Sequence, residues 1–165
     1  MRYQAALLPE TRPLLQWPSR GNRPFDVVPL LDVKATLYAD GGSRGNPGPA
    51  ASGAVRYAED GEVLEEIGTF LGVTTNNVAE WTGLLEGLKA ALARGVDDIS
   101  VRMDSELVVR QLSGAYRVKH PGLIPLHAQA KALLRKFGRT DVQHVRREAN
   151  KAADAVVNQV LDANL

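Results

Sequence analysis

Cysteine is absent from the 165 residues of the chain, and so is any long apolar run. The lack of cysteine excludes disulfides and thiolate metal sites and fits a reducing compartment. No window approaches the roughly 18 consecutive apolar residues of a membrane span. Prolines and Glu10 also interrupt residues 1–18 before the apolar centre of a secretory signal could form. We therefore expect a cytoplasmic protein with no membrane partner, and we expect it to be a monomer.

A strong charge of one sign is also missing, because the formal net charge is only +1. That value says little about nucleic-acid binding, for which basic residues must be clustered. Basic residues do gather in one stretch, which holds Arg110, Arg117, Lys119, His120, Lys131, Arg135, Lys136 and Arg139. A solvated face of an amphipathic helix accounts for Lys131, Arg135 and Lys136 equally well, so both interpretations stay open.

The first 32 residues differ in composition from the rest of the chain. Prolines at positions 9, 13, 18, 24 and 29 break every helical or strand period there. We interpret residues 1–32 as a Pro/Arg-rich N-terminal extension and residues 33–165 as one folded domain. Leu14, Leu15, Trp17 and Phe25 are apolar enough for this extension to dock on the domain or on a partner.

Regular hydrophobic patterns begin near Lys34. Strands are predicted over residues 34–40, 51–58, 63–71, 99–103 and 141–146, with residues 59–61 as a tight hairpin turn. Apolar residues at three- and four-residue spacing predict helices over residues 77–94, 105–112, 123–137 and 148–161. A meander followed by helix-linked strands indicates an α/β fold. Its sheet is five-stranded and mixed, an antiparallel meander plus parallel strands, and is flanked by helices.

Four acids occupy positions where a purely surface role is hard to explain. Asp40 and Asp104 end apolar strand-like runs, while Glu80 and Asp154 accompany the apolar stripes of helices. Ligands collect outside the carboxyl ends of parallel strands in such sheets, and Asp40 and Asp104 lie there. Like charges at a half-buried site raise one another's pKa unless a cation neutralises them. Oxygen-only ligands select hard cations such as Mg²⁺ or Mn²⁺, so these acids predict a metal-dependent nuclease.

Each acid also has a simpler explanation. Asp40 could begin a long turn, and Asp104 could cap the helix that follows it. Residues 77–80 have the spacing of a capping box, in which Glu80 reaches back to the start of its helix. Asp154 could be an exposed helical acid. Any one of these acids is weak evidence alone, and their order along the chain favours the metal site.

Other catalytic motifs are not apparent. The histidines lack the spacing of a zinc pair: His144 falls in a strand, His127 on an amphipathic helix, and His120 in a loop where it could touch a phosphate. Residues 40–49 are glycine-rich but lack the Gly-Lys-Ser/Thr ending of a phosphate-binding P-loop. Their glycines instead offer backbone that a nucleic-acid strand can approach closely.

Four ordered motifs together resemble type 1 ribonuclease H. They are LYADGG at residues 37–42 with GNPG at 45–48, TNNVAE at 75–80, DSELV at 104–108 and EANKAAD at 148–154. The resemblance extends from Lys34 to the C-terminus and implies a ribonuclease H-like catalytic domain. It also implies a metal-dependent endonuclease that hydrolyses the RNA strand of RNA–DNA hybrids, leaving 5′-phosphate and 3′-hydroxyl ends.

The resemblance also implies roles for individual residues. Asp40, Glu80, Asp104 and Asp154 match the four carboxylates that hold two Mg²⁺ ions, with Mn²⁺ as a possible substitute. One ion would activate the attacking water and the second would stabilise the leaving 3′ oxygen. The residues expected to bind substrate are Gly41, Ser43, Arg44, Asn46, Asn76, Asn77 and Lys119. Neutral amides suit a hybrid, because they bond 2′-hydroxyls and base edges without demanding a sequence.

The chain departs from many members of that family in two places. The loop before the last helix is short and lacks their catalytic histidine, so proton shuttling or product release is assigned to Glu148 or to water. Residues 92–100 and 111–121 leave no room for the basic helical protrusion of some members. Hybrid binding is therefore expected to rely on residues 117–120, including Lys119, with a modest affinity that falls steeply with salt.

Two rival functions keep part of this pattern. A junction resolvase, transposase or proofreading exonuclease of the same fold would cluster acids but lack the Asn-Asn-x-x-Glu and Asp-Gly-Gly-Ser arrangements. A non-catalytic hybrid-binding module would not need all four acids, which are present here. Cleavage of an RNA–DNA hybrid, duplex DNA and single-stranded RNA separates these functions.

Overall fold

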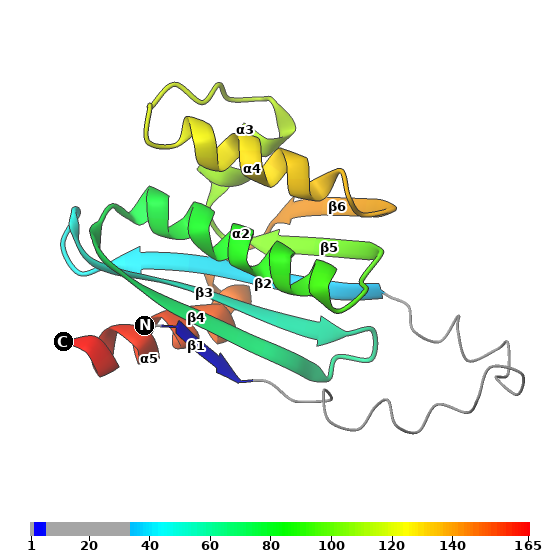
Figure 1. Cartoon of the computed structure of the whole chain (residues 1–165), viewed down its shortest axis with the longest axis horizontal. Coiled ribbons are helices and arrows are strands. Elements are labelled where there is room, and N and C mark those ends of the chain that lie inside the picture. The colour runs from blue at the N-terminus through cyan, green and yellow to red at the C-terminus, as the bar shows by residue number, and fades with distance from the viewer. Residues whose placement is uncertain (1, 6–33) are drawn as a thin grey trace, which may run out of the picture.

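A computed structural model describes residues 2–5 and 34–165. Its strands form one sheet in the order β1-β4-β3-β2-β5-β6 (Figure 1). The strands are β1 Arg2–Ala5, β2 Lys34–Ser43, β3 Gly48–Ala58, β4 Val63–Thr74, β5 Asp98–Met103 and β6 Arg139–His144. The helices are α2 Asn76–Ala93, α3 Glu106–Ser113, α4 Ile124–Leu134, the 3-10 helix η5 Arg147–Asn150 and α5 Lys151–Asn164. The predicted five-stranded mixed sheet is confirmed, and β1 adds a further strand at its edge.

Antiparallel pairing joins β2, β3 and β4 into the predicted meander. The turn between β3 and β4 closes at Gly61, whose φ of 92° lies in the left-handed region that favours glycine. The Gly61 N–H donates to the Ala58 carbonyl at 2.9 Å. Asp60 Oδ1 accepts a hydrogen bond from the Glu62 N–H at 3.0 Å. These local bonds complete the hairpin that residues 59–61 predict.

Parallel pairing places β5 beside β2 and β6 beside β5. The chain reaches β5 through α2 and reaches β6 through α3 and α4, as parallel strands require. Ile99, Val101 and Met103 alternate along β5 and are fully buried, so one face of this strand enters the core. Because β2 and β5 are parallel, their carboxyl ends point toward the same end of the sheet.

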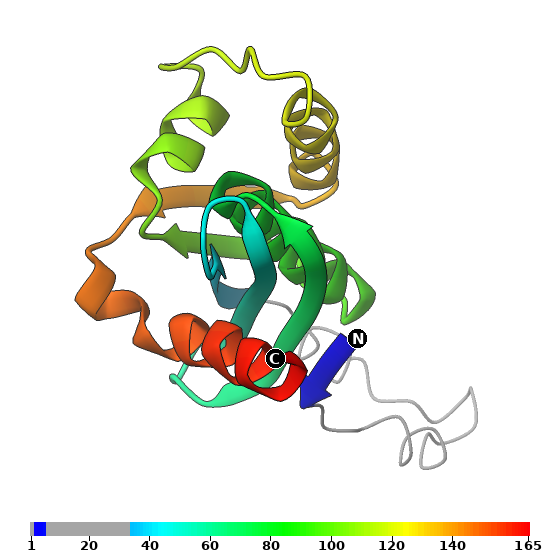
Figure 2. The same cartoon turned by 90° about the vertical axis from the view of Figure 1, so that its left-hand side faces the viewer.

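Helices cover both faces of the sheet, with α2 on one side and α5 on the other (Figure 2). The main core lies between β2, β5 and the helices α2, α3 and α4, and includes Leu37, Trp81, Leu88 and Val108. A smaller apolar layer joins β3 and β4 to α5 through Val156, Val157, Val160 and Leu161. Among the helices of the described residues, none combines the length and hydropathy that a membrane span requires.

Several boundaries differ from the sequence prediction. Arg2–Ala5 form β1 by pairing with β4, although four residues are too short to establish a period in the sequence. The helix predicted over residues 123–137 ends at Leu134, and Phe137 turns into the core at 7% exposure. The last helix begins as the 3-10 helix η5. The remainder of the predicted N-terminal extension, with its expected docking residues, lies outside the described part of the chain.

Two glycines allow α2 to lie against the sheet. A Cβ at Gly83 would overlap the main-chain oxygen of Asp40 and would lie 3.1 Å from the Gly53 oxygen. A Cβ at Gly87 would lie 2.8 Å from the Leu37 methyl groups. The Ala54 Cβ lies 3.1 Å from the same position. The neighbour at Gly83 is rigid backbone, whereas the Leu37 methyl groups are the far end of a side chain and can shift more easily. Gly83 therefore sets how closely the helix approaches β2 beside Asp40.

We expect Gly83→Ala to reduce the free energy of unfolding by about 3 kcal/mol, the upper part of the range for overpacking. Gly87→Ala should change it by less than about 1 kcal/mol, because the helix propensity of alanine offsets a small shift of Leu37. Urea denaturation of the two variants measures the difference. Equal losses of stability would contradict a backbone limit at Asp40.

Candidate active site

Three carboxylates converge where β5 ends beside β2, which continues to Ser43 and so beyond the strand predicted over residues 34–40. The parallel register pairs Ala39 with Met103, so the residues that follow them, Asp40 and Asp104, come side by side. Glu80 approaches from the second turn of α2. Each of the three acids offers an oxygen within 4.8 Å of the oxygens of the other two. Asp40 is buried, and Glu80 and Asp104 are half-buried, so the predicted convergence of these three acids is observed.

Helix capping does not explain Glu80 or Asp104. The N-cap of α2 is Thr75, whose hydroxyl accepts a hydrogen bond from the N–H three residues later at 3.3 Å. The helix therefore starts before Asn77, and the capping box considered for residues 77–80 is not its cap. Ser105 caps α3 in the same way, also at 3.3 Å. Its hydroxyl also hydrogen-bonds Glu80, which links the cap to the cluster.

Close packing of α2 on β2 brings Asp40 and Glu80 together. A Cβ at Gly41 would overlap the backbone of Ala79 and Glu80. Gly83 lies one turn further along α2, where its missing side chain makes room for the Asp40 carbonyl. The sequence predicts Gly41 as backbone for a substrate to approach. The structure shows that Gly41 also leaves room for the helix that carries Glu80.

Asp154 reaches the same cleft from α5 but stands outside the group of three. It is half-buried and lines the cleft together with Asp40, Glu80 and Asp104. The Asn158 side chain donates to Asp154 Oδ2 at 3.2 Å and to its main-chain oxygen at 3.1 Å. The alternative of an isolated surface acid therefore does not describe this residue.

Burial and mutual repulsion make the cluster unfavourable for bare anions. Burial raises the pKa of Asp40 to about 8, the charge of Asp104 adds to the rise, and an N–H bond from Gly41 opposes it. Asp154 and Glu80 act in the same direction as Asp104. Burial likewise raises the pKa of Glu80 to about 7, against the hydrogen bond from Ser105. Oxygen donors that repel one another in this way fit a hard divalent cation, which would neutralise them.

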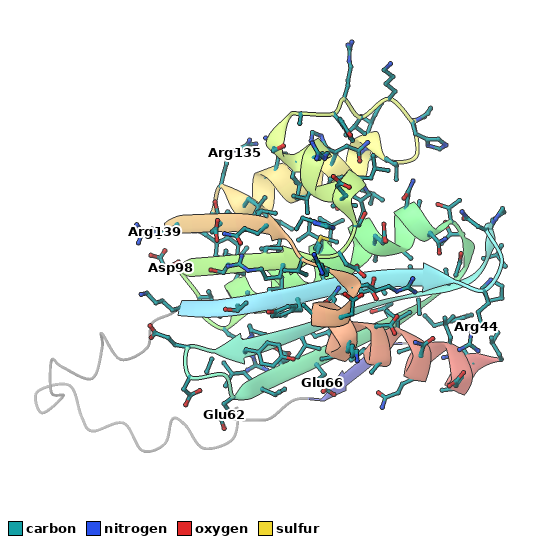
Figure 3. All side chains as sticks on the ribbon, turned by 180° about the vertical axis from the view of Figure 1, so that it is seen from behind. Arg44, Glu62, Glu66, Asp98, Arg135 and Arg139 are labelled. Atoms are coloured by element: carbon teal, nitrogen blue, oxygen red, sulfur yellow. The ribbon has the colours of Figure 1, made fainter. Side chains whose placement is uncertain are left out.

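The acids form the floor of a cleft of about 590 Å³. Many of the residues predicted from sequence line it, namely Gly41, Ser43, Arg44, Asn76 and Asn77. Figure 3 shows Arg44 at this end of the sheet, and Asp98 and Arg139 at the opposite end. The wall from α5 also includes Val157, Asn158 and Leu161, and Arg147 completes the lining.

Hydrogen bonds hold the end of β2 and the loop that follows it against the start of α2. The Ser43 N–H and hydroxyl both donate to Asn76 Oδ1, at 2.8 and 2.9 Å. The Asn76 N–H donates in turn to Asn46 Oδ1 at 3.1 Å. Arg44 forms an ion pair with Asp162 of α5 at 2.7 Å. These polar residues therefore organise the rim of the cleft.

Three of the predicted residues are not part of the cleft lining. Asn46 is exposed and reaches the rim only through its bond to Asn76. Glu148 is exposed on η5, and Lys119 is exposed in the loop between α3 and α4. The histidines also lie outside the lining. His120 Nδ1 accepts from the Gly122 N–H at 2.9 Å, and His127 packs edge-on against Trp81.

Four polar residues at this site were not predicted from the sequence: Ser105, Arg147, Asn150 and Asn158. Ser105 carries a signal, because a serine ahead of an apolar helix is a common cap. Arg147 and Asn158 carry no local signal of a site. Asn150 falls inside the helix predicted over residues 148–161, and only the fold shows that its amide donates to Asp104 Oδ1 at 3.3 Å.

The family model described as reverse transcriptase-like matches residues 38–160. Ribonuclease HI of Halobacterium salinarum is 41% identical over 147 residues, which cover 87% of this chain and 74% of that protein. The bifunctional protein Rv2228c of Mycobacterium tuberculosis is 48% identical over 132 residues, or 79% of this chain. The aligned part is only 36% of the length of Rv2228c, so the chain spans about a third of that relative.

Solved structures agree with these sequences. The N-terminal RNase H domain of Rv2228c has a TM-score of 0.77 and 48% identity, covering 80% of this chain and 96% of that one. RNase H1 of Halobacterium salinarum has a TM-score of 0.77 and 44% identity, covering 79% and 98%. LC11-RNase H1, solved in complex with an RNA/DNA hybrid, has a TM-score of 0.75 and 41% identity, covering 79% and 98%.

These likenesses confirm the ribonuclease H-like fold that the sequence motifs imply. The matched region includes all four acids of the cleft. On this combined evidence of sequence, fold and carboxylate cluster, the chain belongs to the ribonuclease H family.

Proposed function

We propose that this protein is a metal-dependent endonuclease of the type 1 ribonuclease H class. It hydrolyses the RNA strand of RNA–DNA hybrids and leaves 5′-phosphate and 3′-hydroxyl ends. The observation that carries the proposal is the group of three carboxylate oxygens within 4.8 Å of one another, set in an open polar cleft. The similarity to LC11-RNase H1, which was solved with an RNA/DNA hybrid, supports the choice of substrate.

The donor set suits two Mg²⁺ ions, with Mn²⁺ as a substitute. Asp40, Glu80 and Asp104 would supply the shared oxygens, and Asp154 a further one from the wall of the cleft. When bound, such ions lower the pKa of the attacking water and stabilise charge on the leaving oxygen. The protein contributes a rigid cradle, because β2, β5 and α2 hold the carboxylates in place before substrate arrives.

The rim of the cleft suits the sugar and phosphate groups of a hybrid. Asn76 and Asn77 present neutral amides, which donate to and accept from 2′-hydroxyls without base specificity. Asn46 and Ser43 are tied to Asn76 and so share its position. Arg44 lies on the same rim and supplies a cation for a phosphate. We assign substrate binding to these residues and to the backbone at Gly41.

The chain lacks two devices of some relatives, and other residues are proposed to replace them. Without the basic helical protrusion, the hybrid would contact the exposed loop that holds Arg117, Lys119 and His120. Because these contacts are few, the affinity should be modest, and because they are ionic, it should fall as salt rises. Without the mobile histidine, Glu148 or water would shuttle protons or assist product release.

Replacement of Asp40 tests the electrostatic cost of the site. The ordinary pKa of this group is 3.8, and in the folded, metal-free protein it is about 8. Folding therefore favours the protonated form, and stability is lost as pH rises through this interval. At about pH 8.5 in EDTA, the free energy of unfolding of Asp40→Asn should exceed that of wild type by at least about 1 kcal/mol, since one pKa unit corresponds to about 1.4 kcal/mol.

At about pH 4 the two proteins should have the same stability, because Asp40 is then protonated in the folded state. Mn²⁺ should stabilise wild type at about pH 8.5 and should leave Asp40→Asn almost unchanged. Glu62→Gln is the matched control, because Glu62 is exposed and far from the cleft (Figure 3), and it should behave as wild type. Equal stability of wild type and Asp40→Asn at the higher pH would show that the ionised Asp40 side chain does not destabilise the folded protein.

Asp104→Asn tests catalysis. This change removes one metal ligand while keeping the shape of the side chain, so we expect hybrid cleavage with Mg²⁺ or Mn²⁺ to fall by at least about a thousandfold. Binding of the hybrid should stay within about threefold, as measured by fluorescence anisotropy. Wild type should cleave the hybrid and leave duplex DNA and single-stranded RNA intact. A wild-type protein that binds the hybrid without cutting it would instead be a binding module.

Glu148→Gln tests the proposed proton shuttle. We expect kcat to fall by about tenfold or more with KM unchanged, because general acid–base groups contribute at least this much to turnover. Steady-state cleavage of a short hybrid measures both constants. An unaltered kcat would show that Glu148 is only a surface residue of η5.

A further inference from the structure

Asn150 is a fully buried polar residue that the proposed chemistry does not use. It ends η5 and directly precedes α5, which is the N-cap position of that helix. Asparagine is favoured at N-caps, where its side chain normally accepts a bond from the helix backbone. Here the side chain makes no such capping bond and is 1% exposed. The amide therefore serves something other than the helix it begins.

The amide of Asn150 turns toward the point where the pairing between β2 and β5 ends. Its Nδ2 donates to the main-chain oxygen of Ala39 at 3.1 Å and to Asp104 Oδ1 at 3.3 Å. Ala39 and Met103 are the last residues paired between these strands. The amide therefore links the two segments just beyond their last backbone pair. Asn150 Oδ1 is buried with no hydrogen-bond partner among the described residues. A buried acceptor without a partner destabilises the folded protein, whereas both donors of the same amide are bonded.

These two bonds connect three segments that carry acids of the cleft. Ala39 immediately precedes Asp40, Asp104 accepts one bond directly, and Asp154 follows Asn150 by one turn of α5. A lysine or arginine at this place would compete with a metal ion for the charge of Asp104. A neutral amide instead binds Oδ1, leaves the negative charge in place and leaves Oδ2 for a cation.

We propose that Asn150 is a positioning residue of the metal centre. It orients the Asp104 carboxylate and keeps it in register with Asp40 on β2 and with the helix that carries Asp154. This inference rests on the divalent site of the proposed function. It extends that function by assigning metal affinity to a residue that touches neither the metal nor the substrate.

Removal of the two donors should weaken metal binding, because partners that orient metal ligands typically contribute about ten- to hundredfold in metal affinity. Asn150→Leu has nearly the same shape and no donor, and Asn150→Ser leaves space and a hydroxyl too short to make both bonds. Each should raise the dissociation constant for Mn²⁺ by about ten- to hundredfold. The Mg²⁺ concentration for half-maximal cleavage should rise by a similar factor, with KM for the hybrid unchanged.

Isothermal titration of the full chain with Mn²⁺ measures the affinity apart from any activity. Asn164→Leu is the matched control, because Asn164 lies near the end of α5 and its side chain donates to the Val160 carbonyl of its own helix. That variant should bind Mn²⁺ as wild type does. In an Asp104→Ala background, Asn150→Leu should weaken the remaining affinity by a smaller factor than in wild type, because the bond to position 104 is gone and only the bond to the Ala39 carbonyl is left to lose.

The possible outcomes separate this inference from the proposed function. A wild-type protein that does not bind Mn²⁺ would overturn the divalent site itself. A wild-type protein that binds Mn²⁺, with folded Asn150 variants that bind within about twofold of it, would overturn only the role of Asn150. Thermal unfolding in EDTA identifies folded variants, and if Asn150→Leu does not fold, Asn150→Ser decides.

Discussion

Repulsion among Asp40, Glu80 and Asp104 is the constraint on which the rest of the structure depends. Their oxygens lie within 4.8 Å of one another, and burial raises the pKa of Asp40 to about 8 and that of Glu80 to about 7. Anions held this closely destabilise a protein unless a cation shares their space. Without a cation, the fold is therefore less stable than it would be with neutral side chains at these three positions.

The packing of α2 against β2, and the pairing of β2 with β5, fix the positions of the three acids. The parallel register of β2 and β5 places Asp40 beside Asp104, and the missing side chains of Gly41 and Gly83 allow α2 to bring Glu80 against them. Asn150 then joins β2 to the segment after β5 through one amide. These contacts take no part in the proposed reaction, yet each determines a distance between carboxylates.

Much of this arrangement could be predicted from sequence, because strand alternation, helical spacing and turn residues are local signals. The acids at the ends of apolar strands were informative for the same reason. Glu80 was ambiguous, since residues 77–80 satisfy a capping box locally, and only Thr75 as the actual cap resolves it. Asn150 and the strand β1 could not be predicted, because a common cap residue and four ordinary residues acquire their roles only through partners distant in sequence.

Diffraction from crystals soaked in Mn²⁺ would test the proposed metal site without any assay, because the anomalous signal locates the ion. We expect anomalous peaks among the oxygens of Asp40, Glu80 and Asp104. Peaks confined to acids outside the cleft, with none at the carboxylate cluster, would contradict the proposed site.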